Sequence, residues 1–200
     1  MKRNVFIVLA VLGVFMIIIG CSSQLQSGYI ARMTGTVLVN GEPAIPGSAV
    51  KQNDVIYVDD DGESYIDIKF STGHYIRFMG GTLKIADISD TFKLDLESGK
   101  TFAVVERLAR EQSFIVETPT AAAGVRGTKF LIQQKPDEAY ICVCDGVVSV
   151  NKIGEDITRE VGVGQDLHVY QNKSIDEPVE SPQMYQMTID VFIDMGFREE

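Results

Sequence analysis

Hydrophobic and polar residues alternate along most of the chain after residue 36, the period-two pattern of strands that bury one face. Ile66, Ile68 and Phe70, for example, alternate with Asp67 and Lys69. Asn40-Gly41 lies between two such segments and favours a hairpin, because both residues tolerate positive φ. Many short strands separated by turns indicate an all-β sandwich, roll or barrel rather than βαβ units.

The turns divide this body into short, separate strands. Residues 76–78, 83–85 and 92–96 are expected to be three of them, with Gly99 closing the last. Residues 104–112 are expected to be a loop between strands, although they could form one helical turn.

The C-terminal segment, residues 183–200, follows a polar linker at 171–182 and admits two interpretations. Strict alternation of apolar residues with other residues over 185–197 is typical of a strand. Helical spacing of its polar residues, Ser181-Pro182 as a helix start and Gly196 as a stop favour a helix. We favour the helix, packed on the body or on a partner.

The N-terminus carries a targeting signal. Lys2 and Arg3 precede an apolar run of 15 residues, shorter than the ~17–25 that a membrane-spanning helix needs. Residues 18–21, Ile-Ile-Gly-Cys, resemble the lipobox of bacterial lipoproteins. That resemblance implies a signal peptide at 1–20, cleavage between Gly20 and Cys21, and a covalent lipid on Cys21. An uncleaved anchor and ordinary secretion are the alternatives.

The signal predicts a location in the cell envelope. Ser22 after the cysteine favours the outer membrane, facing the periplasm, over the outer face of the cytoplasmic membrane. Residues 21–32 are then expected to be a tether and residues 33–170 the β-domain.

The composition limits the kinds of molecule that the protein is expected to bind. The chain has 200 residues, 45% of them hydrophobic, and a formal charge of −10. Loss of Lys2 and Arg3 with the signal would change that charge to −12. Such an acidic body argues against nucleic-acid binding and against electrostatic attraction to an anionic bilayer. Attachment to the membrane would therefore depend on the lipid.

Residues 118–130, Thr-Pro-Thr-Ala-Ala-Ala-Gly-Val-Arg-Gly-Thr-Lys-Phe, resemble the signature of the FecR family, an exported bacterial domain found in cell-surface signalling regulators. Segments 35–41, 71–78, 143–150 and 164–167 are similar to family hairpins, although Asn53 departs from the usual glycine. The resemblance covers residues 33–170. It implies a mostly antiparallel sandwich or roll, or a β-helix-like FecR-type domain.

The signature also defines a candidate loop, which is structural or ligand-binding. Its glycines are expected to allow a tight turn, and its arginine either ties the loop to backbone carbonyls or faces an anionic ligand. The candidate residues are Thr118, Pro119, Gly124, Val125, Arg126, Gly127 and Thr128.

Other reactive residues are sparse. Cys142 and Cys144 lie two apart on a predicted strand and are expected to be small hydrophobes or thiols. His74 and His168 are expected at surface or boundary positions, too far apart in sequence for a metal set. We therefore expect no catalytic residues, no metal and no cofactor besides the lipid on Cys21.

These features predict a non-catalytic envelope lipoprotein that binds an envelope protein or peptidoglycan, in sensing or assembly. Because only four residues precede the apolar run, no anti-sigma segment is visible and no sigma factor is expected as a partner. One alternative is a structural scaffold that acts through the C-terminal segment. Another is a cell-wall enzyme with paired carboxylates such as Asp59 and Asp67.

Overall fold

Residues 27–197 are described in a computed structural model, and they form an open, mainly antiparallel β-fold with one C-terminal helix. The predicted all-β body with a short helical C-terminal segment is confirmed. The strands are β1 (Gly28–Thr34), β2 (Val37–Val39), β3 (Glu42–Pro43), β4 (Ala49–Val50), β5 (Val55–Val58), β6 (Tyr65–Phe70), β7 (Tyr75–Ile88), β8 (Thr91–Val105), β9 (Ser113–Glu117), β10 (Ala121–Val125), β11 (Thr128–Lys135), β12 (Glu138–Asp145), β13 (Val148–Lys152), β14 (Thr158–Val161), β15 (Gln165–Tyr170) and β16 (Val179–Glu180), and the helix is α2 (Pro182–Asp194).

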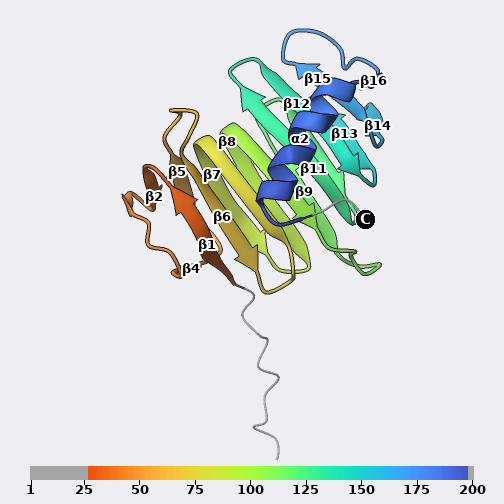
Figure 1. The fold of residues 1–200 in the computed structure, drawn as a ribbon. Helices are drawn as coiled ribbons and strands as arrows, with labels where there is room; N and C mark the ends of the chain where they lie inside the picture. Colours follow the sequence, from red (N-terminus) through yellow and green to blue (C-terminus); the bar gives the residue numbers. More distant parts are fainter. Residues whose placement is uncertain (1–26, 198–200) are drawn as a thin grey trace, which may run out of the picture.

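The strands form one hydrogen-bonded sheet that folds over into two layers, and the long hairpin of β7 and β8 belongs to both (Figure 1). The first half of β7 pairs with β6 and its second half with β5. The end of β8 pairs with β11, and its start runs parallel to β9. One layer therefore has the order β4-β1-β6-β7-β8-β11-β12-β15-β16, and the other has the order β3-β2-β5-β7-β8-β9-β10-β13-β14.

Three glycines let this hairpin bend where it passes between the layers. Gly80, Gly81 and Gly99 all have positive φ, and a Cβ on Gly99 would lie 2.1 Å from the carbonyl oxygen of Gly80. The register between β7 and β8 also shifts between Met79 and Thr82. The prediction of separate strands on either side of these positions was wrong, because glycine allows a bend without ending the hydrogen-bonded ladder.

Aromatic rings from both layers meet in the central core. The ring centroid of Phe92 lies 4.7 Å from that of Phe70 and 4.9 Å from that of Phe114. His74 packs edge-on against Phe92 and Phe114 and is 3% exposed, so the prediction of a surface or boundary position was wrong. Burial lowers the pKa of His74 to about 4, and its Nδ1 accepts a hydrogen bond from the backbone N–H of Glu106.

Helix α2 covers the outer face of the first layer, across β8, β11 and β12 (Figure 1). Its Ile189 and Phe192, with the following Met195, form a second apolar cluster with the sheet. The residues on the sheet side are Phe102, Val104, Leu131, Tyr140, Cys142 and Cys144. Because alternate residues of β12 enter the central core instead, this strand is buried on both faces.

Four charged residues tie the end of α2 to the sheet, and we name them the α2 cluster: Arg32, Asp67, Arg77 and Asp194. Asp67 is fully buried and accepts hydrogen bonds from Arg77 Nε at 2.7 Å and Arg32 Nε at 2.9 Å. Asp194 accepts from Arg77 Nη1 at 2.6 Å and from Arg32 Nη2 at 3.3 Å. Every charge in the α2 cluster therefore has partners of opposite sign.

The body starts earlier than the sequence predicted. Residues 28–32, expected in the tether, belong to β1 and pair with β6. The expected linker at 171–182 contains the buried Ile175, strand β16 and the start of α2. Within residues 27–197, no helix has the length and apolar character to cross a membrane. The predicted signal peptide at 1–20 and Cys21 lie outside the described residues.

Candidate functional site

The first part of the family signature is a structural turn. Thr118 follows β9, and its Oγ1 donates a hydrogen bond to the carbonyl oxygen of Ala121 at 3.0 Å. Thr118 Oγ1 also accepts hydrogen bonds from the backbone N–H groups of Thr120 and Ala121. Ala121 and Ala123 then point into the central core and are completely buried. Thr118 and Pro119 thus form the turn before β10, and we assign them a structural role and no role in ligand binding.

The two signature glycines have different roles. Gly127 has φ +84° and forms the turn between β10 and β11 with Arg126, as predicted. Gly124 lies within β10, and a Cβ there would meet only the carbonyl oxygen of Ser149 at 3.9 Å. The prediction that Gly124 is needed for a tight turn was wrong, because the strand continues through Val125.

Arg126 stands at the surface, where its Nη2 donates one long hydrogen bond, 3.4 Å, to the carbonyl oxygen of Ala109. This bond connects the turn to the loop between β8 and β9, as the structural hypothesis predicted. Arg126 also lines a shallow cavity of about 490 Å³, together with Arg110, Gly124 and Glu160. The structure is therefore compatible with both hypotheses for Arg126, a structural role in the loop and contact with an anionic ligand.

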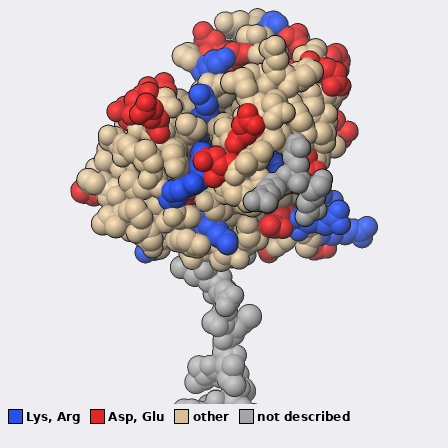
Figure 2. Space-filling view, in the orientation of Figure 1, with Lys and Arg blue, Asp and Glu red and all other residues tan. Residues whose placement is uncertain are grey.

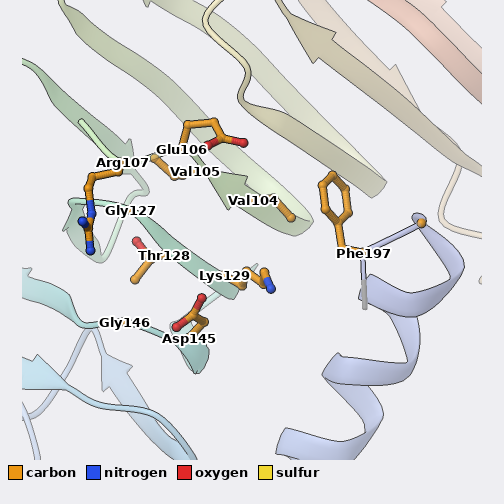
Figure 3. A pocket seen from close by; sticks show the side chains of 11 residues that line it. Val104, Val105, Glu106, Arg107, Gly127, Thr128, Lys129, Asp145, Gly146 and Phe197 are labelled. Carbon is orange, nitrogen blue, oxygen red and sulfur yellow. The ribbon is translucent and has the colours of Figure 1, made fainter. Parts of the chain in front are cut away.

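A larger cavity, about 760 Å³, lies on the other side of the same turn (Figure 3). The ends of β8 and β12 and the start of β11 form its walls. Gly196 and Phe197, which follow α2, close one side. We name it the motif cavity. Its lining residues are Val104, Val105, Glu106, Arg107, Gly127, Thr128, Lys129, Asp145, Gly146, Gly196 and Phe197.

Thr128 lines the motif cavity and has a buried hydroxyl. The residue is 2% exposed, and its Oγ1 has no hydrogen-bond partner among residues 27–197. A Cβ on Gly146 would lie 2.5 Å from the Thr128 methyl carbon, so glycine is required for this contact. Figure 3 shows the hydroxyl on the side away from Gly146, and Thr128 shares the inward face of β11 with Phe130, so the hydroxyl is closed off from the cavity. Thr101 in β8 likewise has a buried hydroxyl without a partner among residues 27–197.

Four charged residues line the motif cavity, and we name them the motif cluster: Glu106, Arg107, Lys129 and Asp145 (Figure 3). None of them makes an ion pair with another residue of the described chain. Lys129 and Asp145 are direct partners across β11 and β12, and still their charged groups do not pair. The sequence reasoning missed this cluster, whose only local signals were the Asp145-Gly146 turn and the loop after residue 104.

The surface charges gather at separate places on the molecule. Figure 2 shows acidic side chains concentrated at the loop between β5 and β6, and basic side chains at the loop after β8. The acidic loop contains Asp61, whose carboxylate accepts hydrogen bonds from the backbone of Glu63 and Ser64. These bonds lower the pKa of Asp61 and make the loop a self-contained turn.

The paired-carboxylate alternative does not agree with the geometry. Asp67 is buried and engaged by Arg32 and Arg77, so it is held as a structural anion, whereas Asp59 is exposed. Among residues 27–197 no group of three or more metal-ligating side chains comes together.

The two cysteines of β12 lie beneath α2, and neither forms a disulfide within the described chain. Hydrogen bonds from Cys144, Thr188 and Tyr140 lower the pKa of the Cys142 thiol to about 7 against the opposing effect of burial. Cys142 is completely buried under the helix, so this thiol has no access to solvent in the folded state.

Two solved structures share this fold. Both are crystal structures, at 1.65 Å and 2.50 Å resolution, described as a "putative anti-sigma factor" from Parabacteroides distasonis ATCC 8503. Each has a TM-score of 0.56 and 21% sequence identity, over 64% of this chain and 61% of the other. The present chain therefore spans about three fifths of that protein, and the likeness concerns the fold. No curated protein matches this chain.

These neighbours correct one prediction about partners. The sequence predicted that no sigma factor is involved, whereas the structures that share the fold are described as anti-sigma factors, which are linked to sigma factors. That prediction rested on the few residues before the apolar run, and the fold comparison contradicts it.

The family signature and the cavities beside it lie in the same part of the chain. The family described as FecR protein matches residues 59–149, from the end of β5 into β13. This range includes the whole motif cluster and the turn at Arg126. The match over residues 59–149 is consistent with a FecR-domain family protein.

Proposed function

We propose that this protein is a lipid-anchored, non-catalytic component of envelope signalling whose FecR domain binds a protein partner. The single observation that carries the proposal is the FecR match over residues 59–149. The description of the two solved structures as anti-sigma factors supports a regulatory role of the same kind. A sigma-factor-linked regulator is accordingly a candidate partner.

The partner surface in this proposal is the end of the domain that carries the signature turn. Arg110 and Arg126 extend from adjacent loops there, and neither makes an ion pair within residues 27–197. Arginine is a common anchor of protein interfaces because its planar guanidinium combines charge with donor geometry. Loops held by a rigid scaffold are also the usual place for binding residues.

In-cell photocrosslinking tests this surface. A photoreactive amino acid replaces Arg126 in one variant and Lys51, an exposed turn residue before β5, in a matched control. We expect a discrete crosslinked protein from position 126 and none from position 51. Equal yields from both positions, or no adduct from position 126, would refute the proposed surface.

The lipid anchor in this proposal rests on the sequence Ile-Ile-Gly-Cys at 18–21. The acidic body supports it indirectly, because a surface this negative is not attracted to anionic lipids. Cys21→Ala should abolish labelling by a fatty-acid analogue and release the protein from membranes. Cys142→Ala serves as the control and should leave labelling intact. Labelling that persists in Cys21→Ala would contradict the anchor.

A second candidate is a scaffold role through α2, favoured by two exposed apolar side chains on that helix. Met187 is 61% exposed and Ile193 is 50% exposed, although the same helix buries Phe192. Deleting the helix would uncover the second apolar cluster and disturb the body. The cleaner test replaces Met187 and Ile193 with glutamine, and an undiminished complex of native size would exclude this role.

A further inference from the structure

The shallow cavity of about 490 Å³ beside the signature turn, which we name the Gly124 pocket, lies on the layer that α2 does not cover (Figure 1). One row of directly opposed residues crosses it on four neighbouring strands: Ile115 in β9, Gly124 in β10, Ser149 in β13 and Glu160 in β14. Alternate residues of the same strands enter the central core, so the row faces outwards. None of its four residues is buried. The row is therefore part of the molecular surface formed by residues 27–197.

Gly124 leaves a gap in the middle of this row, and the fold does not require a glycine there. A Cβ on Gly124 would meet only the carbonyl oxygen of Ser149, at 3.9 Å, which is an ordinary contact distance. Glycine inside a strand lowers stability relative to alanine, and it often marks a site where a ligand or another backbone approaches closely. The glycine thus keeps space free above β10 at the centre of the pocket.

Arginines without ion pairs gather beside this space. Of the arginines within residues 27–197, three pair with carboxylates. The others, Arg107, Arg110 and Arg126, have no ion pair there, and all of them lie in the signature turn or the loop before β9. The chain has 28 acidic residues, so carboxylates are not in short supply. Arg110 and Arg126 line the Gly124 pocket and remain available to an anion from another molecule.

The other residues of the pocket suit an acidic side chain. Two arginines and one acid, Glu160, line it, so its formal charge is 2 − 1 = +1. A guanidinium group binds a carboxylate through two parallel N–H bonds. Val147, which is 49% exposed, also lines the pocket and offers apolar contact for methylene groups. Because the partner proposed above is a protein, aspartate and glutamate are its ordinary anionic side chains.

We propose that the Gly124 pocket receives an acidic side chain of the protein partner, whose backbone passes over β10 at Gly124. Arg110 and Arg126 bind the carboxylate, Val147 contacts its methylene groups, and Glu160 accepts a hydrogen bond from a backbone N–H of the same segment. This inference rests on the function proposed above, and it specifies which chemical group the partner presents and where it binds.

In-cell photocrosslinking from position 147 of the full chain tests the proposal, because a probe at Val147 lines the pocket and leaves both arginines in place. We expect a discrete adduct whose crosslinked partner fragment contains Asp or Glu. Its yield should exceed the yield from position 126, where the probe replaces one of the two arginines. An adduct that is equal or stronger at position 126 would overturn this inference and leave the proposed function standing. No adduct from either position would refute both.

Substitutions in the position-147 variant test the charge. Arg110→Gln should lower the adduct yield about fivefold or more. Arg107→Gln removes the same charge from the same loop but outside the Gly124 pocket, and it should leave the yield unchanged. Equal losses from the two variants would mean that general surface charge attracts the partner, and the proposal would fail.

Charge exchange identifies the contact. Arg110→Glu should abolish the adduct, and replacement of the crosslinked partner's acidic residue by arginine should restore it. Because restoration requires the two residues to face each other, failure of every mapped acidic residue to restore the adduct would overturn the assigned contact.

Gly124→Val tests the space above β10, with Ala122→Val as the matched control on the same face of the same strand but outside the pocket. Gly124→Val should lower the adduct yield about fivefold or more. Its thermal unfolding midpoint should stay the same or rise, because valine favours strands and the added Cβ has room. Ala122→Val should leave the yield unchanged. A native yield in both Gly124→Val and Gly124→Ala, or an equal loss in Ala122→Val, would overturn the proposal.

Discussion

The α2 cluster and the motif cluster contain the same kinds of groups, two carboxylates and two cations each, in opposite arrangements. In the α2 cluster every charge is bonded to at least one opposite charge, and Asp67 and Arg77 are buried. In the motif cluster no charge is paired within the described chain, although Lys129 and Asp145 are cross-strand neighbours. Paired, buried charges hold an element in place, whereas unpaired charges around a cavity remain available to a ligand.

The largest expected effect comes from breaking the α2 cluster at its buried anion. Asp67→Ala leaves Arg77 buried without its main partner, and we expect the free energy of unfolding to fall by about 3–5 kcal/mol. Urea denaturation followed by circular dichroism measures the loss. Asp145→Ala, which removes an unpaired carboxylate from the motif cluster, is the matched control. A loss below 1 kcal/mol for Asp67→Ala would show that the buried pairs contribute little.

A second effect concerns the core histidine, His74, which accepts a hydrogen bond from the backbone N–H of Glu106. The pKa of His74 is lowered to about 4 in the folded state, so below pH 6.5 the unfolded chain binds more protons at this site than the folded one. The contribution of neutral His74 to the free energy of unfolding is fully present above pH 6.5. It is lost as the pH falls towards 4, and the loss is about 3 kcal/mol at most.

The variant His74→Gln isolates this contribution from that of the acidic residues. The difference in unfolding free energy between the native chain and His74→Gln should shrink between pH 7 and pH 4, as measured by urea denaturation at each pH. A difference that stays constant over this range would mean that His74 does not titrate differently in the two states.

A smaller effect is expected at the exposed end of the α2 cluster. Asp194 is 59% exposed at its side chain, so its pairs with Arg77 and Arg32 are screened by solvent. Asp194→Asn should cost about 1 kcal/mol or less and act locally on the last turn of α2. Hydrogen exchange of the α2 amides should become faster, with exchange in β12 unchanged. Equal acceleration in both elements would instead indicate global destabilisation.

The smallest effects are expected in the motif cluster itself. Arg107→Gln and Lys129→Gln remove charges without partners among the described residues, so each should change the unfolding free energy by less than about 0.5 kcal/mol. Thermal unfolding at equal ionic strength is sufficient to measure this. A large loss for either variant would show that the motif cluster stabilises the fold, as the α2 cluster does.

Local patterns predicted the elements well where the decisive groups are near in sequence. Asn40-Gly41, with positive φ at both residues, forms the expected hairpin between β2 and β3. Pro182 occupies the first turn of α2 and Gly196 follows its end with φ +97°, as predicted. The alternation of Ile66, Ile68 and Phe70 likewise corresponds to one buried face of β6.

The candidate site was predicted only in part. The signature residues around Arg126 indicated the right turn, since the glycine and arginine are adjacent in the chain. Glu106 and Asp145 could not be connected with that turn, because they reach the motif cavity through strand pairings across β8, β11 and β12. The structural role of Asp67 was likewise invisible, since its partners lie 10 and 35 residues away.

The sequence alone determined the period-two strands, the turns between them and the FecR signature, because each depends on residues within a few positions of one another. It favoured the C-terminal helix but left a strand open there, and the structure decided for the helix. The tertiary structure decided that β7 and β8 bend through both layers, that His74 is buried, and that one set of charges pairs while the other does not. These outcomes depend on which strands become neighbours. Burial and distance across the folded sheet, rather than residue type, then decide whether a charge is bonded within the protein.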